Sequence, residues 1–314
     1  MKVTERTVTG NRRMRQEPPF PDGLEARAGT VMDRITAQLP SLTESERRAA
    51  RALLAGYPGT GLDTVGLFAE RAGVSAPTVL RFISKLGFSG YPEFRRTLRQ
   101  ELEASVAYPL TRPHNAESGA EGLKVLGEGL AELIRASIAM TPQGEIDRLV
   151  DLLRDERRGV FLLGGHFTEP AARHLAFHLR KLRPRVRVVA QDILLRADEL
   201  IEIRRGDVFV AFDVRRYQRD TVASVHCAKA RGAKTVLFTD QWMSEAAKAS
   251  DIAFRARIDG PSRWDSLVGM IAQVELVAQA LDEKIWSNAR RRVEGIERTR
   301  ATLAGDAGDD SSRG

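Results

Sequence analysis

Residues 64–86, TVGLFAERAGVSAPTVLRFISKL, contain two short helical patterns separated by a tight turn. The first pattern follows Thr64, which can cap a helix, and its apolar residues recur at i, i+3, i+4 and i+7. These residues are Val65, Phe68, Ala69 and Ala72. Gly73 then allows the positive φ that ends many helices. Two short helices joined in this way predict a helix-turn-helix.

The second helix is predicted to begin with Ser75 as its N-cap and to end at Gly87. Its apolar side chains form one stripe for burial, made of Val79, Phe82, Ile83 and Leu86. The other side chains are mainly hydroxyls and cations, and they point away from the stripe or lie on its flanks. They comprise Pro77, Arg81 and Ser84 on the outward face, with Thr78 and Lys85 on the flanks.

Such a face suits the major groove of DNA, because cations pair with guanine edges or phosphates and hydroxyls with either. We expect six residues to contact duplex DNA: Ser75, Ala76, Thr78, Arg81, Ser84 and Lys85. Residues 75–100 carry five cations against one acid, a balance of +4 that favours DNA through counterion release. The alternative is an ordinary solvated face in a helical bundle.

The length of 314 residues predicts two domains. Upstream of the helix pair, Thr43-Glu44-Ser45-Glu46 has the pattern of a capping box and predicts the start of a supporting helix. We expect the following organisation: a disordered arm over 1–23, a helix-turn-helix domain over 24–105, a linker over 106–122, an α/β domain over 123–290, and a basic helix end with a disordered tail over 291–314.

Composition places the chain among soluble globular proteins, with 42% hydrophobic and 29% charged residues. No apolar run approaches the ~20 residues that cross a bilayer, and the N-terminus lacks the apolar centre of a secretory signal. The lone Cys227 cannot form an intrachain disulfide. We therefore expect a cytoplasmic protein without membrane contact, and its net charge of +7 favours a polyanionic partner.

The second half of the chain alternates buried strands with helices. Apolar runs typical of parallel strands occur at 160–163, 186–189, 208–212, 235–238 and 252–258. Helical patterns follow at 171–182, 193–203, 221–230, 244–249 and 266–281. This alternation predicts an α/β doubly wound parallel sheet, in which ligands bind at the carboxyl ends of the strands.

Two of the loops at those carboxyl ends carry groups that suit an anion. The loop Gly164–Pro170 precedes a helix and can present backbone N–H groups and a hydroxyl. The loop Asp213–Asp220 contains three arginines, whose guanidinium forks bind carboxylates or phosphates. Alternatively, these arginines pair with Asp213 and Asp220 in a structural network.

No metal, cofactor or catalytic centre is expected. His174 and His178 lie one helical turn apart, a spacing used by metal sites, but no third ligand is evident in the sequence. We interpret this pair as a surface or subunit contact. His226 and Cys227 are neighbours on a predicted helix and do not face each other, and the acids show no general acid–base pairing.

From about Leu42 to Leu281 the chain resembles the RpiR/MurR family of bacterial transcription regulators. The resemblance is carried by LTESERRAARALL and by AERAGVSAPTVLRFISKLGFSGYPEFR, which begin at Leu42 and Ala69. It implies an N-terminal helix-turn-helix joined to a C-terminal SIS (sugar isomerase) domain. Specific binding to double-stranded operator DNA then becomes the expected function.

The ligand loops depart from the family pattern. The family's first loop reads Gly-x-Gly-x-Ser, whereas this chain has Gly164, Gly165, His166, Phe167 and Thr168. The second family loop reads Ser-x-Ser-Gly-x-Thr and cradles a sugar phosphate, but its positions hold Asp213, Arg215, Arg216 and Gln218. Long arginines replace short serines and a glycine, so the phosphate cradle cannot survive unchanged.

We therefore expect a small anionic effector, a phosphosugar or a carboxylate, held by Arg215 or Arg216 with Thr168 and Ser244 nearby. The predicted effector residues are Gly164, His166, Thr168, Asp213, Arg215, Arg216 and Ser244. A second possibility is that the domain binds no effector and serves only to dimerise.

The sequence as a whole predicts a regulator that grips a pseudo-palindromic operator as a homo-oligomer, a dimer or tetramer. The alternative is an SIS-type phosphosugar isomerase with a helical appendage, which requires an acid–base pair and an intact phosphate loop. A third interpretation is a structural or interaction module without specific DNA binding.

Overall fold

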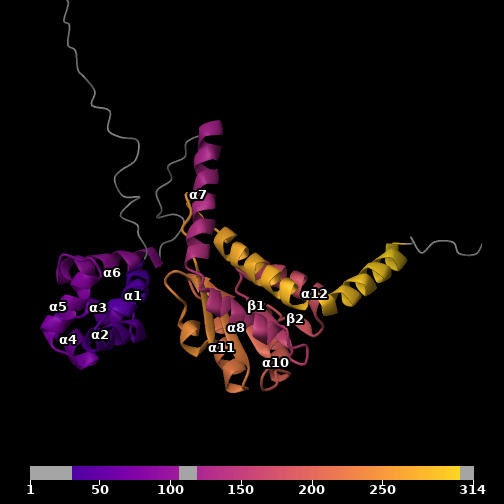
Figure 1. Ribbon diagram of the computed structural model, residues 1–314, viewed down its shortest axis with the longest axis horizontal. Coiled ribbons are helices and arrows are strands. Elements are labelled where there is room, and N and C mark those ends of the chain that lie inside the picture. Colours follow the sequence, from indigo (N-terminus) through magenta and orange to yellow (C-terminus); the bar gives the residue numbers. More distant parts are fainter. Residues whose placement is uncertain (1–29, 106–118, 305–314) are drawn as a thin grey trace, which may run out of the picture. The chain divides into compact units, whose positions relative to one another are not determined.

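The computed structural model describes residues 30–105 and 119–304, and the chain divides into two compact units, Met1–Arg95 and Arg96–Gly314 (Figure 1). The predicted arm over 1–23, most of the linker and the end of the tail lie outside the described residues. The first unit is helical. Its elements, with the helix that leaves it, are α1 Val31–Gln38, η2 Leu39–Ser41, α2 Glu44–Ala55, α3 Gly59–Leu62, α4 Val65–Ala72, α5 Ala76–Lys85 and α6 Tyr91–Ser105.

Local hydrogen bonds set the ends of these helices as the sequence predicts. Thr43 caps α2: its backbone N–H donates to Glu46 at 2.8 Å, and the Glu46 N–H donates to the Thr43 hydroxyl. Gly73 has φ +60° after α4. A second capping box, Thr30 with Asp33, begins α1 and was not predicted. The apolar stripes of α4 and α5 are buried together, with Phe68 and Phe82 fully enclosed.

The second unit is an α/β domain. Two helices, α7 Ala120–Ala139 and α8 Gln143–Leu153, precede five strands: β1 Val160–Gly164, β2 Val186–Val188, β3 Val208–Asp213, β4 Lys234–Asp240 and β5 Ile252–Ala256. Between and after them lie α9 Glu169–Leu182, α10 Ile193–Ile201, α11 Arg219–Ala230, η4 Glu245–Ala249 and α12 Val268–Ala304. All the strands pair in parallel, in the order β2-β1-β3-β4-β5. The predicted doubly wound sheet is confirmed.

Alternate strand residues pack on opposite faces of the sheet, as the two-residue period requires. Even-numbered residues such as Leu162, Val210 and Phe238 pack with α8, α9 and α12. Odd-numbered residues such as Leu163 and Leu237 pack with α10, α11 and η4. Both faces are covered, which explains why the strands read as continuous apolar runs.

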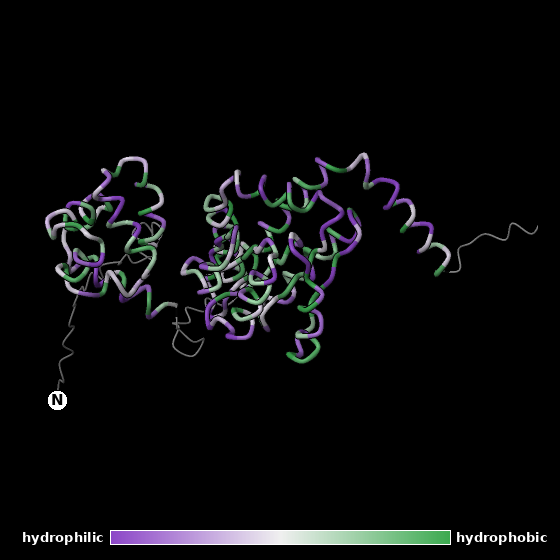
Figure 2. The backbone as a smooth tube through the Cα atoms, turned by 90° about the horizontal axis from the view of Figure 1, so that it is seen from below, coloured by the Kyte–Doolittle hydropathy of each residue, from purple (hydrophilic) through white to green (hydrophobic). Residues whose placement is uncertain are grey.

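The structure corrects three of the predicted elements. The helix predicted over 244–249 is the 3₁₀ helix η4, Glu245–Ala249, with Ser244 as its N-cap, and the last strand ends at Ala256 rather than at residue 258. The helix predicted over 266–281 continues to Ala304 as α12, although its buried residues end at Ala289. The last turns of α12 are mainly hydrophilic (Figure 2), so apolar periodicity could not reveal them. Among the described residues, no helix has both the length and the apolar character needed to span a membrane.

Candidate functional site

The outward face of α5 carries most of the side chains predicted to contact DNA. Ser75, Arg81, Ser84 and Lys85 are exposed, and Ala76 is half-buried. Hydroxyl and guanidinium groups therefore share one accessible surface of a short helix, and these groups can pair with base edges and phosphates.

Thr78 differs from the prediction of a flank position, because its side chain is buried. Its hydroxyl lies 2.9 Å from the Ser75 hydroxyl and accepts a hydrogen bond from Arg81 Nη2 at 3.4 Å. Ser75 occupies the N-cap position but makes no side-chain bond to the helix backbone. The two hydroxyls thus contact each other, and Thr78 orients Arg81 instead of facing solvent.

Lys85 connects two helices. Its ammonium group donates to the buried carboxylate of Glu46 at 2.8 Å and to the carbonyl of Ser41 at 3.3 Å. Burial favours the neutral form of Glu46, but hydrogen bonds from Lys85 and Thr43 outweigh burial and lower the pKa of this carboxyl. Lys85 therefore holds α5 against the start of α2 and is only partly available to an external anion.

Leu80 is an exposed residue of this face that the sequence reasoning missed. It is 45% exposed beside Arg81. An apolar side chain in this position can contact a thymine methyl group. The signal was present in the sequence, because Leu80 falls outside the apolar stripe that α5 buries.

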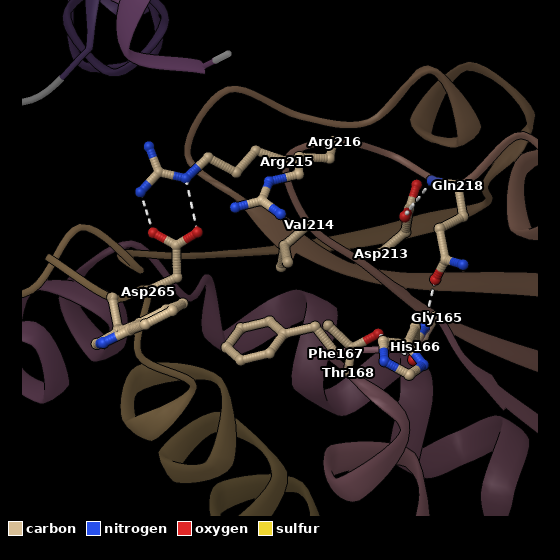
Figure 3. Close-up of a pocket in the computed structure, with 11 residues that line it drawn as sticks. Gly165, His166, Phe167, Thr168, Asp213, Val214, Arg215, Arg216, Gln218 and Asp265 are labelled. Atoms are coloured by element: carbon tan, nitrogen blue, oxygen red, sulfur yellow. Dashed lines mark hydrogen bonds and ion pairs between the residues drawn. The ribbon is translucent and has the colours of Figure 1, made fainter. Parts of the chain in front are cut away.

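The second candidate site lies at the carboxyl ends of β1 and β3. These strands are neighbours, but α9 and α11, which follow them, pack on opposite faces of the sheet. Such a reversal opens a crevice where α/β domains bind ligands. A cavity of about 280 Å³ occupies it (Figure 3), lined by Gly165, His166, Phe167, Thr168, Asp213, Val214, Arg215, Arg216, Gln218, Trp264 and Asp265.

The first loop of the cavity needs its two glycines for close packing. A Cβ on Gly164 would lie 2.4 Å from Glu169 Cα, and one on Gly165 would lie 2.4 Å from Gln218 Oε1. The Thr168 hydroxyl donates to the carbonyl of Phe212 at 2.6 Å, which ties this loop to β3. Gly164 therefore has a packing role and does not line the cavity, and the Thr168 hydroxyl is already engaged.

The second loop is anchored by Asp240, at the end of β4, which the sequence reasoning did not select. Its carboxylate accepts hydrogen bonds from the N–H of Arg215 at 2.5 Å, the hydroxyl of Tyr217 at 2.8 Å and the N–H of Trp242 at 3.0 Å. Burial raises the pKa of Asp240 to about 6 despite these bonds. Its position at the carboxyl end of a buried strand was the available signal.

Asp213 places a second carboxyl group at the cavity. It accepts hydrogen bonds from the Ser244 hydroxyl and, at 3.2 Å, from the N–H of Gln218. Burial and the nearby carboxylates of Asp240 and Asp220 raise its pKa to about 6. Ser244 is buried, caps η4 through the N–H of Ala246, and does not line the cavity.

The arginines of the second loop have different environments. Arg215 forms a bidentate pair with Asp265, and its guanidinium lies 4.9 Å from the Trp242 ring centroid. The alternative pairing with Asp213 or Asp220 is wrong for Arg215, and Asp220 accepts from Arg196 at 2.8 Å. Figure 3 shows Arg215 with Asp265 at one end of the cavity. Arg216 is exposed and has φ +71°.

At the other end of the cavity, Gln218 reaches the first loop (Figure 3). Its side-chain carbonyl accepts a hydrogen bond from the N–H of His166. This backbone donor, which could otherwise face an anion, is thus occupied by the protein's own amide. Gln218 stands where the related loops carry a threonine, and its reach across the cavity could not be deduced from the sequence.

The histidine pair of α9 acquires a third group in the folded chain. Glu275 of α12 lies beside His174 and His178, although 101 and 97 residues separate it from them in sequence. His226 and Cys227 are both exposed on α11.

Comparisons with known proteins agree with both units. A sequence model of the rpiR-type helix-turn-helix domain matches residues 29–105, and a SIS domain model matches residues 152–281. The transcriptional regulator HexR of Pseudomonas aeruginosa is 30% identical over 214 residues, which cover 67% of this chain and 73% of HexR.

Two solved structures share the fold. The sugar isomerase domain of an RpiR transcription factor from Sphaerobacter thermophilus is 26% identical, with a TM-score of 0.51 over 56% of this chain and 97% of that one. The Vibrio vulnificus NanR protein, complexed with ManNAc-6P, is 16% identical, with a TM-score of 0.51 over 87% of this chain and 99% of that one. The chain belongs to the rpiR family of helix-turn-helix transcriptional regulators and carries a C-terminal SIS domain.

Proposed function

We propose that this regulator binds a pseudo-palindromic operator as a homo-oligomer through α5, and that its SIS domain senses a small anionic metabolite. The observation that supports DNA binding through α5 is the exposure of Ser75, Arg81 and Ser84 on one face of this helix. Thr78 supports this role indirectly through its hydrogen bond with Arg81. Ala76 and Lys85 complete the proposed contact surface, with Lys85 restricted by Glu46.

The DNA proposal is tested with fragments of the source genome selected on the full-length protein. Arg81→Ala should remove the preference for a selected fragment over a scrambled one and leave weak nonspecific binding, because a bidentate guanidinium carries base discrimination. Arg154→Ala is the matched control, since Arg154 is an exposed arginine of the other unit that pairs with Asp151. Retained discrimination by Arg81→Ala in a mobility-shift assay would refute the assignment.

For the effector we propose the cavity between β1 and β3, with Arg216 as the anion-binding residue. Arg216 is chosen because its side chain is cationic, exposed and lines the cavity. Arg215 and Thr168 also line the cavity and bond to Asp265 and to the carbonyl of Phe212, so they shape the site, whereas Ser244 does not line it. The complex of NanR with ManNAc-6P supports a phosphosugar as the ligand class. Asp213 and Gln218 stand at positions where the family loop has hydroxyl donors. This replacement favours a ligand with a smaller negative charge than a phosphate, such as a carboxylate.

The backbone conformation of Arg216 allows its proposed role in anion binding to be tested without a change in the loop. Its φ of +71° is left-handed, the conformation that glycine adopts without strain at the same position of the family loop. Arg216→Gly therefore removes the guanidinium and keeps the loop backbone. In calorimetric titrations with hexose phosphates, hexosamine phosphates and small carboxylates, the wild type and Arg154→Ala should bind one class and Arg216→Gly should not. Equal affinity in Arg216→Gly would exclude Arg216.

A second candidate function rests on Asp213. A carboxyl with a pKa of about 6 at a cavity has the property of a general base, which a phosphosugar isomerase would need. We nevertheless propose that the domain is not catalytic, because Asp240, whose pKa is also raised to about 6, is buried behind the second loop and does not line the cavity. A turnover assay with aldose and ketose phosphates separates the two functions, and conversion that Asp213→Asn abolishes would establish the isomerase.

A further inference from the structure

Three side chains of metal-ligand type meet between α9 and α12, and none of them belongs to either proposed site. His174 Nε2 lies 2.5 Å from Glu275 Oε1, and His178 Nε2 lies 3.4 Å from the same oxygen. One ligand atom from each residue falls within 4.8 Å of the other two. The two histidines can be recognised as a pair in the sequence, whereas Glu275 joins them only in the folded chain.

The positions of these residues are set by well-packed helices. Residues four apart on a helix share a face, so the two imidazole rings lie together with centroids 4.9 Å apart. Leu175 and Leu179 of α9 and Val274 of α12 are fully buried beside them. The backbone at the cluster is therefore fixed, while the ligand side chains remain 28–52% exposed.

The hydrogen bonds within the cluster are incomplete. The Nε2 atom of His178 is buried from solvent and has no partner with hydrogen-bond geometry in the described part of the chain, despite its 3.4 Å separation from Glu275. The same carboxylate oxygen of Glu275 is the hydrogen-bond partner of His174 Nε2. A carboxylate oxygen beside two imidazole nitrogens matches the donor set that Zn²⁺ prefers.

We propose that His174, His178 and Glu275 bind a divalent transition metal ion of the Zn²⁺ class, with a fourth position left for an external ligand. Ligand atoms around a tetrahedral zinc lie roughly 3.3 Å apart, as its bond lengths of about 2.0–2.1 Å require. The His178–Glu275 separation already matches this value. The His174–Glu275 contact has to lengthen by roughly 1 Å, which these partly exposed side chains permit.

The fourth position has access to an external ligand. His178 and Glu275 also line a cavity of about 250 Å³, together with Lys181, Gln279, Asp282 and Trp286. The ammonium of Lys181 opposes a nearby cation, whereas the carboxylate of Asp282 favours it. Because the ligands come from α9 and α12, a bound metal would cross-link two of the three helices that cover this face of the sheet.

The test uses the full-length protein without an affinity tag, treated with chelator and titrated with ZnCl₂ in a calorimeter. We expect one ion per chain, and a Kd raised about tenfold or more in His174→Ala, His178→Ala and Glu275→Gln. Substitution with Co²⁺ should give the visible absorption of a tetrahedral site in the wild type and not in the variants. His226→Ala is the matched control, because His226 is an exposed histidine beside Cys227 on α11.

Thermal unfolding provides a second readout of binding, because a ligand that binds only the folded chain raises the unfolding midpoint by an amount set by the ratio of its concentration to Kd. At a Zn²⁺ concentration close to the wild-type Kd, the midpoint should rise clearly in the wild type and in His226→Ala, and much less in Glu275→Gln, which keeps the shape of the side chain. Absence of binding to the wild type would overturn the proposal. Unchanged affinity in the three cluster variants, or loss of binding in His226→Ala, would place the metal elsewhere and overturn it as well.

Discussion

At the scale of single residues, the loops around the cavity of the SIS domain hold two buried carboxyls and one left-handed arginine. Asp213 and Asp240 are buried carboxyls, and each has a pKa raised to about 6. Arg216 holds a left-handed backbone that costs an L residue roughly 1–2 kcal/mol. Their concentration around one pair of loops supports the proposal that this cavity binds an effector.

The raised pKa of Asp213 leads to a prediction for how the unfolding free energy depends on pH. Its pKa is higher in the folded chain than in the unfolded chain, so its contribution to stability is complete below about pH 4 and is lost as the pH rises through 6. Relative to the wild type, Asp213→Asn should therefore gain roughly 1 kcal/mol in unfolding free energy between pH 5 and pH 8.

Tryptophan fluorescence in urea can measure this difference for the second unit alone. The three tryptophans of the chain are Trp242, Trp264 and Trp286, and all lie in that unit. The two carboxyls are close, so Asp240→Asn should show the same sign. A difference between variant and wild type that stays constant from pH 5 to pH 8 would contradict the assigned shift.

At the scale of elements, the features that could be predicted are those set by residues close together in the sequence. The capping box at Thr43, the left-handed Gly73 and the buried strands follow from local patterns and are confirmed. The predicted flank position of Thr78 failed because its hydroxyl pairs with Ser75 and its side chain turns inward. The apolar stripe of α5 predicted which face of the helix is buried, but it did not predict the hydrogen-bond partners of the residues beside that face.

The site residues that were missed have partners distant in the chain. Asp265 lies 50 residues from Arg215, and Glu275 lies 101 residues from His174. The spatial meeting of such groups depends on the sheet order and on the path of α12, which hydrophobic periodicity does not specify. The cavity at β1 and β3 was nevertheless anticipated, since strand ends in a doubly wound sheet are the general ligand position.

The contact between α5 and α2 leads to a prediction for Lys85. If this residue mainly stabilises the domain, Lys85→Met should lower the unfolding free energy by about 1 kcal/mol, because the buried Glu46 loses a charged partner while the exposed lysine limits the effect. Operator affinity should fall less than in Arg81→Ala. Circular dichroism during urea unfolding, in a double-mutant cycle with Glu46→Gln, measures the coupling, and a coupling near zero would show the pair to be energetically silent.

At the scale of the whole molecule, the proposed homo-oligomer requires a surface that buries apolar side chains. Among the described residues, α10 exposes four large aliphatic side chains to solvent: Ile193 at 62%, Leu194 at 75%, Leu195 at 59% and Ile201 at 62%. A group of exposed aliphatic residues on one short helix is typical of a protein interface. We therefore expect α10 to contact a second copy of the chain.

Leu194→Asp tests this surface, because a carboxylate at the centre of an apolar interface cannot be desolvated without a large cost. In the isolated chain Leu194 is exposed, so the fold and the tryptophan unfolding curve should be unchanged, whereas light scattering should show dissociation to a smaller species. Operator affinity should fall as well, since a pseudo-palindrome is gripped by two linked heads and a single head loses the gain in effective concentration. Leu303→Asp, at an 83% exposed position near the end of α12, is the matched control. An unchanged mass in Leu194→Asp, or dissociation in Leu303→Asp, would show that copies of the chain associate through another surface.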